Sequence, residues 1–77
     1  MAKYRLISAL TLQFKSQREK ALLTLELLTK HPAGIGDHST QDFYDNAEEA
    51  IKALAEAEDV LQTIQTYFPN AEDLLHD

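Results

Sequence analysis

The chain has 77 residues, of which 44% are hydrophobic and 26% charged, and it contains no cysteine and no tryptophan. This length permits one domain with a thin core, because small chains bury a low fraction of their surface. Without cysteine, the chain cannot form a disulfide framework or a thiolate site for zinc or an iron–sulfur cluster. Thirteen acidic and seven basic residues give a net charge of −6, which argues against a protein that binds nucleic-acid phosphates.

The charge is divided between the two halves of the chain. Residues 1–31 carry six basic and two acidic side chains, for a net charge of +4. Residues 32–77 carry only Lys52 against eleven acidic side chains, for a net charge of −10. Because these charges alternate with apolar residues at helical spacing, we interpret the two halves as amphipathic helices that attract each other.

The first predicted helix covers residues 3–30, which contain neither proline nor glycine and are rich in good helix formers. Apolar residues recur at helical spacing along this segment, although its middle, residues 15–20, is polar. Lys30 and His31 place positive charge at the C-terminal end, where the helix dipole favours it. The side chains expected to be buried are those of Ile7, Leu10, Phe14, Ala21, Leu25 and Leu28.

A turn is predicted at residues 31–39, where both glycines and one of the two prolines of the chain are found. Glycine permits the positive φ angles that such a turn requires. Two interpretations remain open. The segment is either a simple turn between helix caps, or a loop that presents its polar residues to a ligand or partner. The second interpretation makes four loop residues speculative binding residues: Gly34, Gly36, Asp37 and His38.

The second predicted helix covers residues 40–68 and has the more regular pattern, with apolar residues in alternating steps of four and three. Ser39 or Thr40 is suited to cap its first turn, and Pro69 ends it. A stripe that covers about three positions in seven is typical of a helix in a globular bundle. The stripe consists of Phe43, Ala47, Ala50, Leu54, Ala57, Leu61, Ile64 and Phe68.

A short link between two helices of equal length predicts an antiparallel helical hairpin. We set the register by placing Leu28 opposite Phe43. Bulky Phe14 then faces small Ala57, as interdigitated packing prefers. The other facing pairs are Ile7 with Ile64, Leu10 with Leu61 and Ala21 with Ala50, and the expected ion pairs are Lys15 with Glu56 and Glu19 with Lys52.

Two helices cannot cover each other's broad apolar stripes. Large apolar residues such as Leu22 and Ile51 remain on the flanks of the predicted hairpin. Small helical chains commonly bury such residues by forming oligomers. The predicted fold class is therefore all-α, with one hairpin domain over residues 1–77 that dimerisation completes as a four-helix bundle. Residues 69–77 are expected to form an acidic C-terminal tail.

Glu56 and Asp59 lie three residues apart, which places both carboxylates on one face of the second helix. All-α nucleotide pyrophosphohydrolases hold magnesium with pairs of this kind, gathered from several helices. The first helix offers only Glu19 and Glu26 as further acidic ligands. We therefore expect a solvated acidic face without metal or cofactor, and we retain Glu56 and Asp59 as speculative contacts to a ligand or partner.

Three segments carry a resemblance to known proteins: KYRLISAL near the N-terminus, HPAGIGDH at the turn, and AEAEDVLQTIQTYF in the second helix. They are similar to small uncharacterised proteins of T4-like tailed phages, notably marine ones. The resemblance spans residues 3–68 and is most specific at residues 32–38. In those phage proteins a proline often follows the final histidine of the turn, where this chain has Ser39. The resemblance implies a virally encoded protein in the cytoplasm of an infected bacterium, and it brings no established activity.

The sequence contains no nucleophile elbow and no phosphate-binding loop. It also has no run of about 18 apolar residues, the length that a bilayer span requires. We therefore predict a non-enzymatic interaction module, an oligomeric hairpin that binds a host or phage protein and contacts neither nucleic acid nor membrane directly. Two alternatives remain: a binder of small ligands or nucleotides, including a magnesium-dependent pyrophosphohydrolase with its site at the oligomer interface, and an acidic mimic of nucleic acid.

Overall fold

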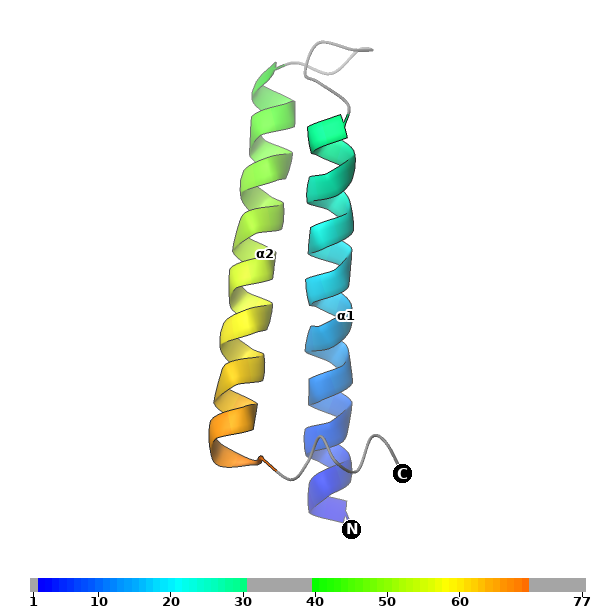
Figure 1. Ribbon diagram of the computed structural model, residues 1–77, viewed down its shortest axis with the longest axis vertical. Helices are drawn as coiled ribbons and strands as arrows, with labels where there is room; N and C mark the ends of the chain where they lie inside the picture. The colour runs from blue at the N-terminus through cyan, green and yellow to red at the C-terminus, as the bar shows by residue number, and fades with distance from the viewer. Residues whose placement is uncertain (1, 31–39, 70–77) are drawn as a thin grey trace.

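The computed structural model describes residues 2–30 and 40–69, and this part of the chain forms two α-helices and no strand. Helix α1 covers Ala2–Lys30 and helix α2 covers Thr40–Tyr67. They run antiparallel along their whole length in a rod with extents of 51 × 20 × 15 Å (Figure 1). The predicted all-α helical hairpin is thereby confirmed. The predicted turn at residues 31–39 and the tail beyond Pro69 lie outside the described residues.

The observed helix ends lie within one residue of the predicted ones. The backbone N–H of Phe68 donates to the carbonyl oxygen of Ile64 at 2.7 Å, which closes the last turn of α2. Pro69 follows directly and lacks the N–H group that a further helical hydrogen bond would need. At the end of α1, Lys30 Nζ approaches Glu26 Oε1 at 2.8 Å, and its charge lies where the helix dipole favours a cation.

The core of the hairpin is built from small side chains. The buried residues within the described ranges are Ala21, Ala50 and Ala57, together with Thr11, and none of them is more than 7% exposed. No large side chain of the described residues is fully buried. Alanine lets the two helix backbones approach closely along the seam, the line where α1 and α2 face each other. Larger side chains in the seam, such as Phe14, extend past the single partner helix and stay half-buried.

Thr11 occupies a seam position for which the sequence favoured Leu10. Thr11 is 3% exposed, whereas Leu10 is half-buried at the edge. The Thr11 hydroxyl donates to the carbonyl oxygen of Ile7 at 2.8 Å, so burial leaves it hydrogen-bonded. Positions 7, 11 and 14 follow the repeat of 3.5 residues by which two long helices keep one seam together. A hydrophobic pattern could not reveal this position, because its residue is polar.

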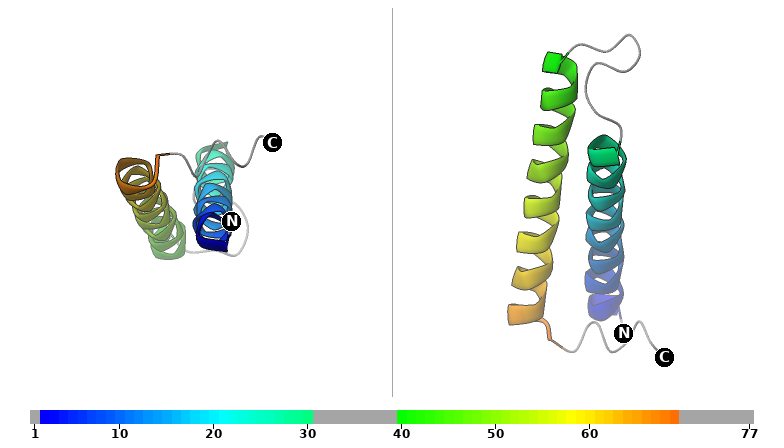
Figure 2. Two further views of the ribbon diagram at one scale, coloured as in Figure 1. Left: turned by 90° about the horizontal axis from the view of Figure 1, so that it is seen from below. Right: turned by 45° about the horizontal axis from the view of Figure 1, so that its top comes forward.

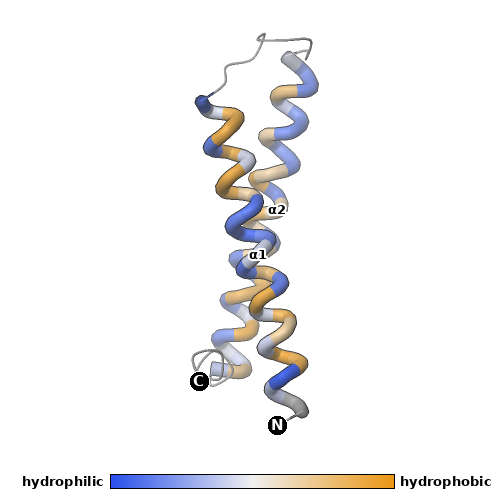
Figure 3. Tube along the Cα trace, turned by 90° about the vertical axis from the view of Figure 1, so that its right-hand side faces the viewer, coloured by the Kyte–Doolittle hydropathy of each residue, from blue (hydrophilic) through white to orange (hydrophobic). Residues whose placement is uncertain are grey.

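The two helices form a single layer, and no other described element covers either side of it (Figure 2). Coloured by hydropathy, the polar residues 15–20 appear as a hydrophilic stretch in the middle of α1, with apolar segments on both sides (Figure 3). Large apolar side chains therefore remain exposed on the described hairpin. They are Leu6, Leu12, Leu22, Leu23, Leu27, Tyr44, Ile51, Tyr67 and Phe68.

Candidate functional site

The structure describes two of the six residues that the sequence singled out. Glu56 and Asp59 both lie on α2, and both are exposed. The other four lie outside the described residues: Gly34, Gly36, Asp37 and His38.

Glu56 and Asp59 have different surroundings. The Glu56 carboxylate accepts a hydrogen bond from Gln17 Nε2 across the seam, at 2.8 Å. Asp59 accepts through its backbone oxygen a bond of 2.9 Å from the Thr63 hydroxyl, one turn further along α2. Within the ranges 2–30 and 40–69, no three histidine or acidic side chains come together as a metal site would require. The described residues thus supply these two carboxylates with no third ligand of that kind.

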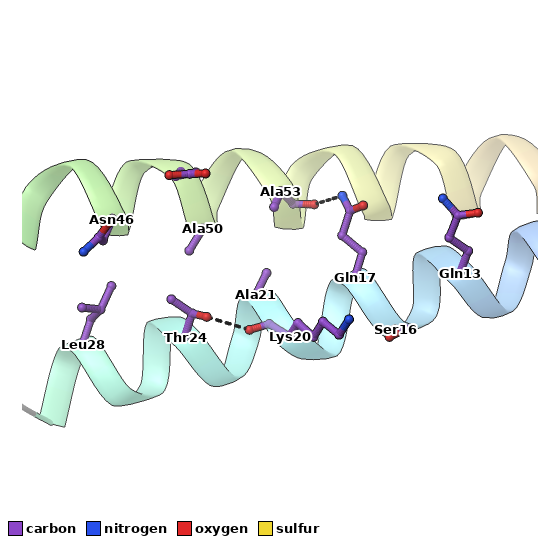
Figure 4. A pocket seen from close by; sticks show the side chains of 11 residues that line it. Gln13, Ser16, Gln17, Lys20, Ala21, Thr24, Leu28, Asn46, Ala50 and Ala53 are labelled. Carbon is purple, nitrogen blue, oxygen red and sulfur yellow. Dashed lines mark hydrogen bonds between the residues drawn. The ribbon is translucent and has the colours of Figure 1, made fainter.

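Gln17 is a polar side chain that ties the two helices together. Besides Glu56, its amide nitrogen donates to the backbone oxygen of Ala53 at 2.9 Å. Ala21 and Ala50, one turn away, both point into the space between the helices (Figure 4). These contacts agree with the predicted register, in which Ala21 faces Ala50.

The ion pairs of Glu19 and Lys52 differ from the expected pairing across the seam. Arg18 Nε lies 3.4 Å from Glu19 Oε2, and Lys52 Nζ lies 3.4 Å from Glu48 Oε2. Both pairs lie within one helix. Residues one turn apart have Cβ atoms only about 5–6 Å from each other, so an exposed lysine reaches a carboxylate on its own helix readily. The predicted pairing of Glu19 with Lys52 is replaced by these local contacts.

A groove of about 610 Å³ runs between α1 and α2 on the side to which Gln17 points (Figure 4). We call it the Gln17 groove. Its floor is made of small apolar residues, and its walls carry amide and hydroxyl groups, the Lys20 ammonium and the Glu49 carboxylate. The groove is lined by Gln13, Ser16, Gln17, Lys20, Ala21, Thr24, Leu28, Asn46, Glu49, Ala50 and Ala53.

The chemistry of the Gln17 groove is that of hydrogen bonding. The Thr24 hydroxyl donates to the backbone oxygen of Lys20 at 2.9 Å. Ser16, the other hydroxyl of the lining, has no histidine among the lining residues to act as its base. Sequence reasoning missed this groove, although positions 13, 17, 20 and 24 recur at helical spacing and are all polar. Their side chains form a row of polar groups along the groove.

The Gln17 bridge carries a first prediction. Replacing Gln17 with alanine removes both hydrogen bonds across the seam, and should lower the free energy of unfolding by about 0.5–1.5 kcal/mol. Urea denaturation followed by circular dichroism measures this loss. Gln13→Ala is the matched control, because Gln13 lines the same groove one turn earlier on α1. An equal loss in both variants would show that the bridge adds no stability of its own.

No known protein family, curated protein or solved structure matches this chain. Neither helix, in the part of the chain that the structure describes, offers an apolar stretch long enough to cross a membrane.

Proposed function

We propose that this chain is a non-enzymatic interaction module, which forms a homodimeric four-helix bundle and binds a host or phage protein. One observation carries the proposal: nine large apolar side chains of the described hairpin are 44% or more exposed, while its buried side chains are three alanines and a threonine. A chain with so thin a core gains stability by covering some of these side chains with a second copy.

The C-terminal half of α1 gives this proposal further support. Residues 21–28 read ALLTLELL, and their leucines lie on every side of the helix. Helix α2 covers one of these sides, so that Leu22, Leu23 and Leu27 remain 44–55% exposed. A helix that is apolar all round is normally buried on all sides. The segment therefore has apolar side chains on more sides than α2 covers.

Charge supports the second part of the proposal, which concerns the partner. Helix α2 carries seven acidic residues and one basic residue, and all seven acidic side chains are exposed. A single-sign field of this kind attracts a basic surface and raises the rate of association. We therefore propose that the partner presents basic side chains to α2. Guided by the resemblance to phage proteins, we place this interaction in the cytoplasm of an infected bacterium.

Sedimentation equilibrium tests the oligomeric state. We expect a mass of twice 8.7 kDa, and a melting temperature that rises with protein concentration, because association stabilises the folded state. A stable monomer of 8.7 kDa with cooperative melting would contradict the dimer.

Affinity capture from host lysate at low and high salt tests the partner. We expect a basic protein that is retained at low salt and released at high salt. Capture of no partner at low salt would contradict this part.

A further inference from the structure

We infer that the second copy docks on one particular side of the hairpin, and that the two hairpins lie with their Lys30 and Thr40 ends together. This inference rests on the proposed function, which supplies the dimer. The docking side is defined by Arg18 and Leu22 on α1 and by Tyr44, Ile51 and Glu58 on α2, and we call it the Leu22–Ile51 face.

Helix geometry places Leu22 and Ile51 on the same side. Ala21 and Ala50 both point into the space between the two helices (Figure 4). Each following residue is rotated by about 100° around its helix. Because the helices run antiparallel, these two rotations carry Leu22 and Ile51 to one side of the layer. The two side chains therefore lie next to each other, 44% and 53% exposed.

The rest of the face follows from spacing and from a second hollow. Arg18 precedes Leu22 by one turn, and Tyr44 and Glu58 lie two turns to either side of Ile51. Tyr44 is 65% exposed. Arg18 and Glu58 line one hollow of about 260 Å³, which confirms that they share a side. The face thus combines an apolar centre with Arg18 and Glu58, and Gln62 and Gln65 line the same hollow.

The opposite side of the seam, at the same height along the helices as Leu22 and Ile51, is less suited to a second copy. It is the Gln17 groove, where amide, hydroxyl and charged groups line the walls. Covering the groove would take these polar groups out of water, and each would need a new hydrogen-bond partner. Covering the Leu22–Ile51 face would remove the exposed side chains of Leu22, Tyr44 and Ile51 from water. The second copy therefore docks where burial is favourable.

Charge selects the orientation of the two copies. A two-fold axis can place α1 of one copy either on α1 or on α2 of the other. Over their observed ranges, α1 has a net charge of +4 and α2 a net charge of −6. Packing like helices together would pair helices of like net charge, whereas packing α1 on α2 of the second copy pairs helices of opposite net charge.

The favoured orientation also matches side chains. Both hairpins then have their Lys30 and Thr40 ends at the same end of the bundle, and equal levels face each other. Leu22 meets Ile51 of the second copy. Arg18 lies a little over one turn from the level of Glu58 of the second copy. The two side chains incline toward each other, because side chains on a helix tilt toward its N-terminus.

Disulfide trapping tests this arrangement, and the chain has no cysteine of its own to interfere. The variants Leu22→Cys and Ile51→Cys are oxidised separately and as a mixture. We expect the mixture to give covalent dimers at least about tenfold faster than either variant alone, because a disulfide requires Cβ atoms about 3.5–4.5 Å apart. Leu27→Cys mixed with Ile51→Cys is the control, since Leu27 is equally exposed but lies on another side of α1.

Charge exchange supplies a second readout that needs no covalent bond. Arg18→Glu and Glu58→Arg should each weaken self-association by about tenfold, because each places two like pairs across the interface. Mixing the two variants should restore it, since both contacts across the interface of the mixed dimer are then between opposite charges. A pairing confined to one chain would give no restoration on mixing.

The outcomes separate this inference from the proposed function. A monomer in sedimentation would overturn both. A dimer in which Leu22→Cys alone is trapped fastest would overturn the orientation, because α1 would then lie on α1. A dimer that traps neither at position 22 nor at position 51, and shows no restoration on charge exchange, would overturn the docking face alone.

Discussion

Replacing both Leu22 and Ile51 with glutamate is expected to raise the Kd of the proposed dimer by more than about 100-fold. Covering a leucine or isoleucine side chain contributes about 1.5–3 kcal/mol relative to leaving it in water. Each side chain occurs twice in a two-fold dimer, and every 1.4 kcal/mol or so is a factor of ten in Kd. Sedimentation equilibrium over a range of protein concentrations measures the change.

Leu27→Glu provides the control for this experiment. Leu27 is 50% exposed, close to the 44% of Leu22, and lies five residues further along the same helix. Five residues correspond to a rotation of about 140° around α1, so Leu27 points away from the Leu22–Ile51 face. We expect Leu27→Glu to dimerise like the parent chain. Equal weakening by both variants would mean that the copies associate through another side of α1.

Replacing Ala57 with leucine is expected to lower the free energy of unfolding by about 1–3 kcal/mol. The Ala57 side chain is fully buried, with 0% exposure. The added methyl and methylene groups have no space in a seam where the helix backbones approach closely, and relief of the overlap forces the helices apart or the side chain out of its rotamer. Urea denaturation followed by circular dichroism, at one fixed protein concentration, measures the loss.

Ala55→Leu is the matched control for the overpacking experiment. Ala55 lies two residues before Ala57 on α2 and is exposed. Alanine and leucine both favour helix, so the change at position 55 should leave stability within about 0.5 kcal/mol of the parent chain. An equal loss at both positions would show that helix propensity, and not the seam, accounts for the effect.

The helices could be predicted from the sequence because their signals are local. Residues 3–30 contain neither proline nor glycine, so a helix that reaches Lys30 was expected. Pro69 lacks the N–H group that the next helical hydrogen bond needs, so the end of α2 at Tyr67 was expected as well. Alternating steps of four and three on α2 predicted Ala50 and Ala57 as seam residues, and both are buried. The register followed from placing Leu28 opposite Phe43, and the contact between Gln17 and Ala53 lies within one residue of it.

The polar contacts could not be predicted from the same pattern. Thr11 and Gln17 are polar, so a search for apolar positions passes over them, although one is buried and the other bridges the helices. The pairing of Lys52 with Glu48 depended on the competition between a neighbour on the same helix and a residue across the seam. Which carboxylate a lysine contacts depends on the distance that its side chain must span. Sequence spacing gives this distance between residues of one helix, but not between residues of two helices.

By itself, the sequence determined that this protein forms two long antiparallel helices, because breakers, helix propensity and apolar periodicity all act between near neighbours. It also determined that two helices leave apolar residues uncovered, because the count of such residues exceeds what one partner helix can cover. The tertiary structure decided which polar residues enter the seam. It also decided that the Gln17 groove and the Leu22–Ile51 face lie on opposite sides of the layer. Both depend on how one helix is rotated against the other, and this rotation is fixed only when Ala21 and Ala50 are buried between the helices.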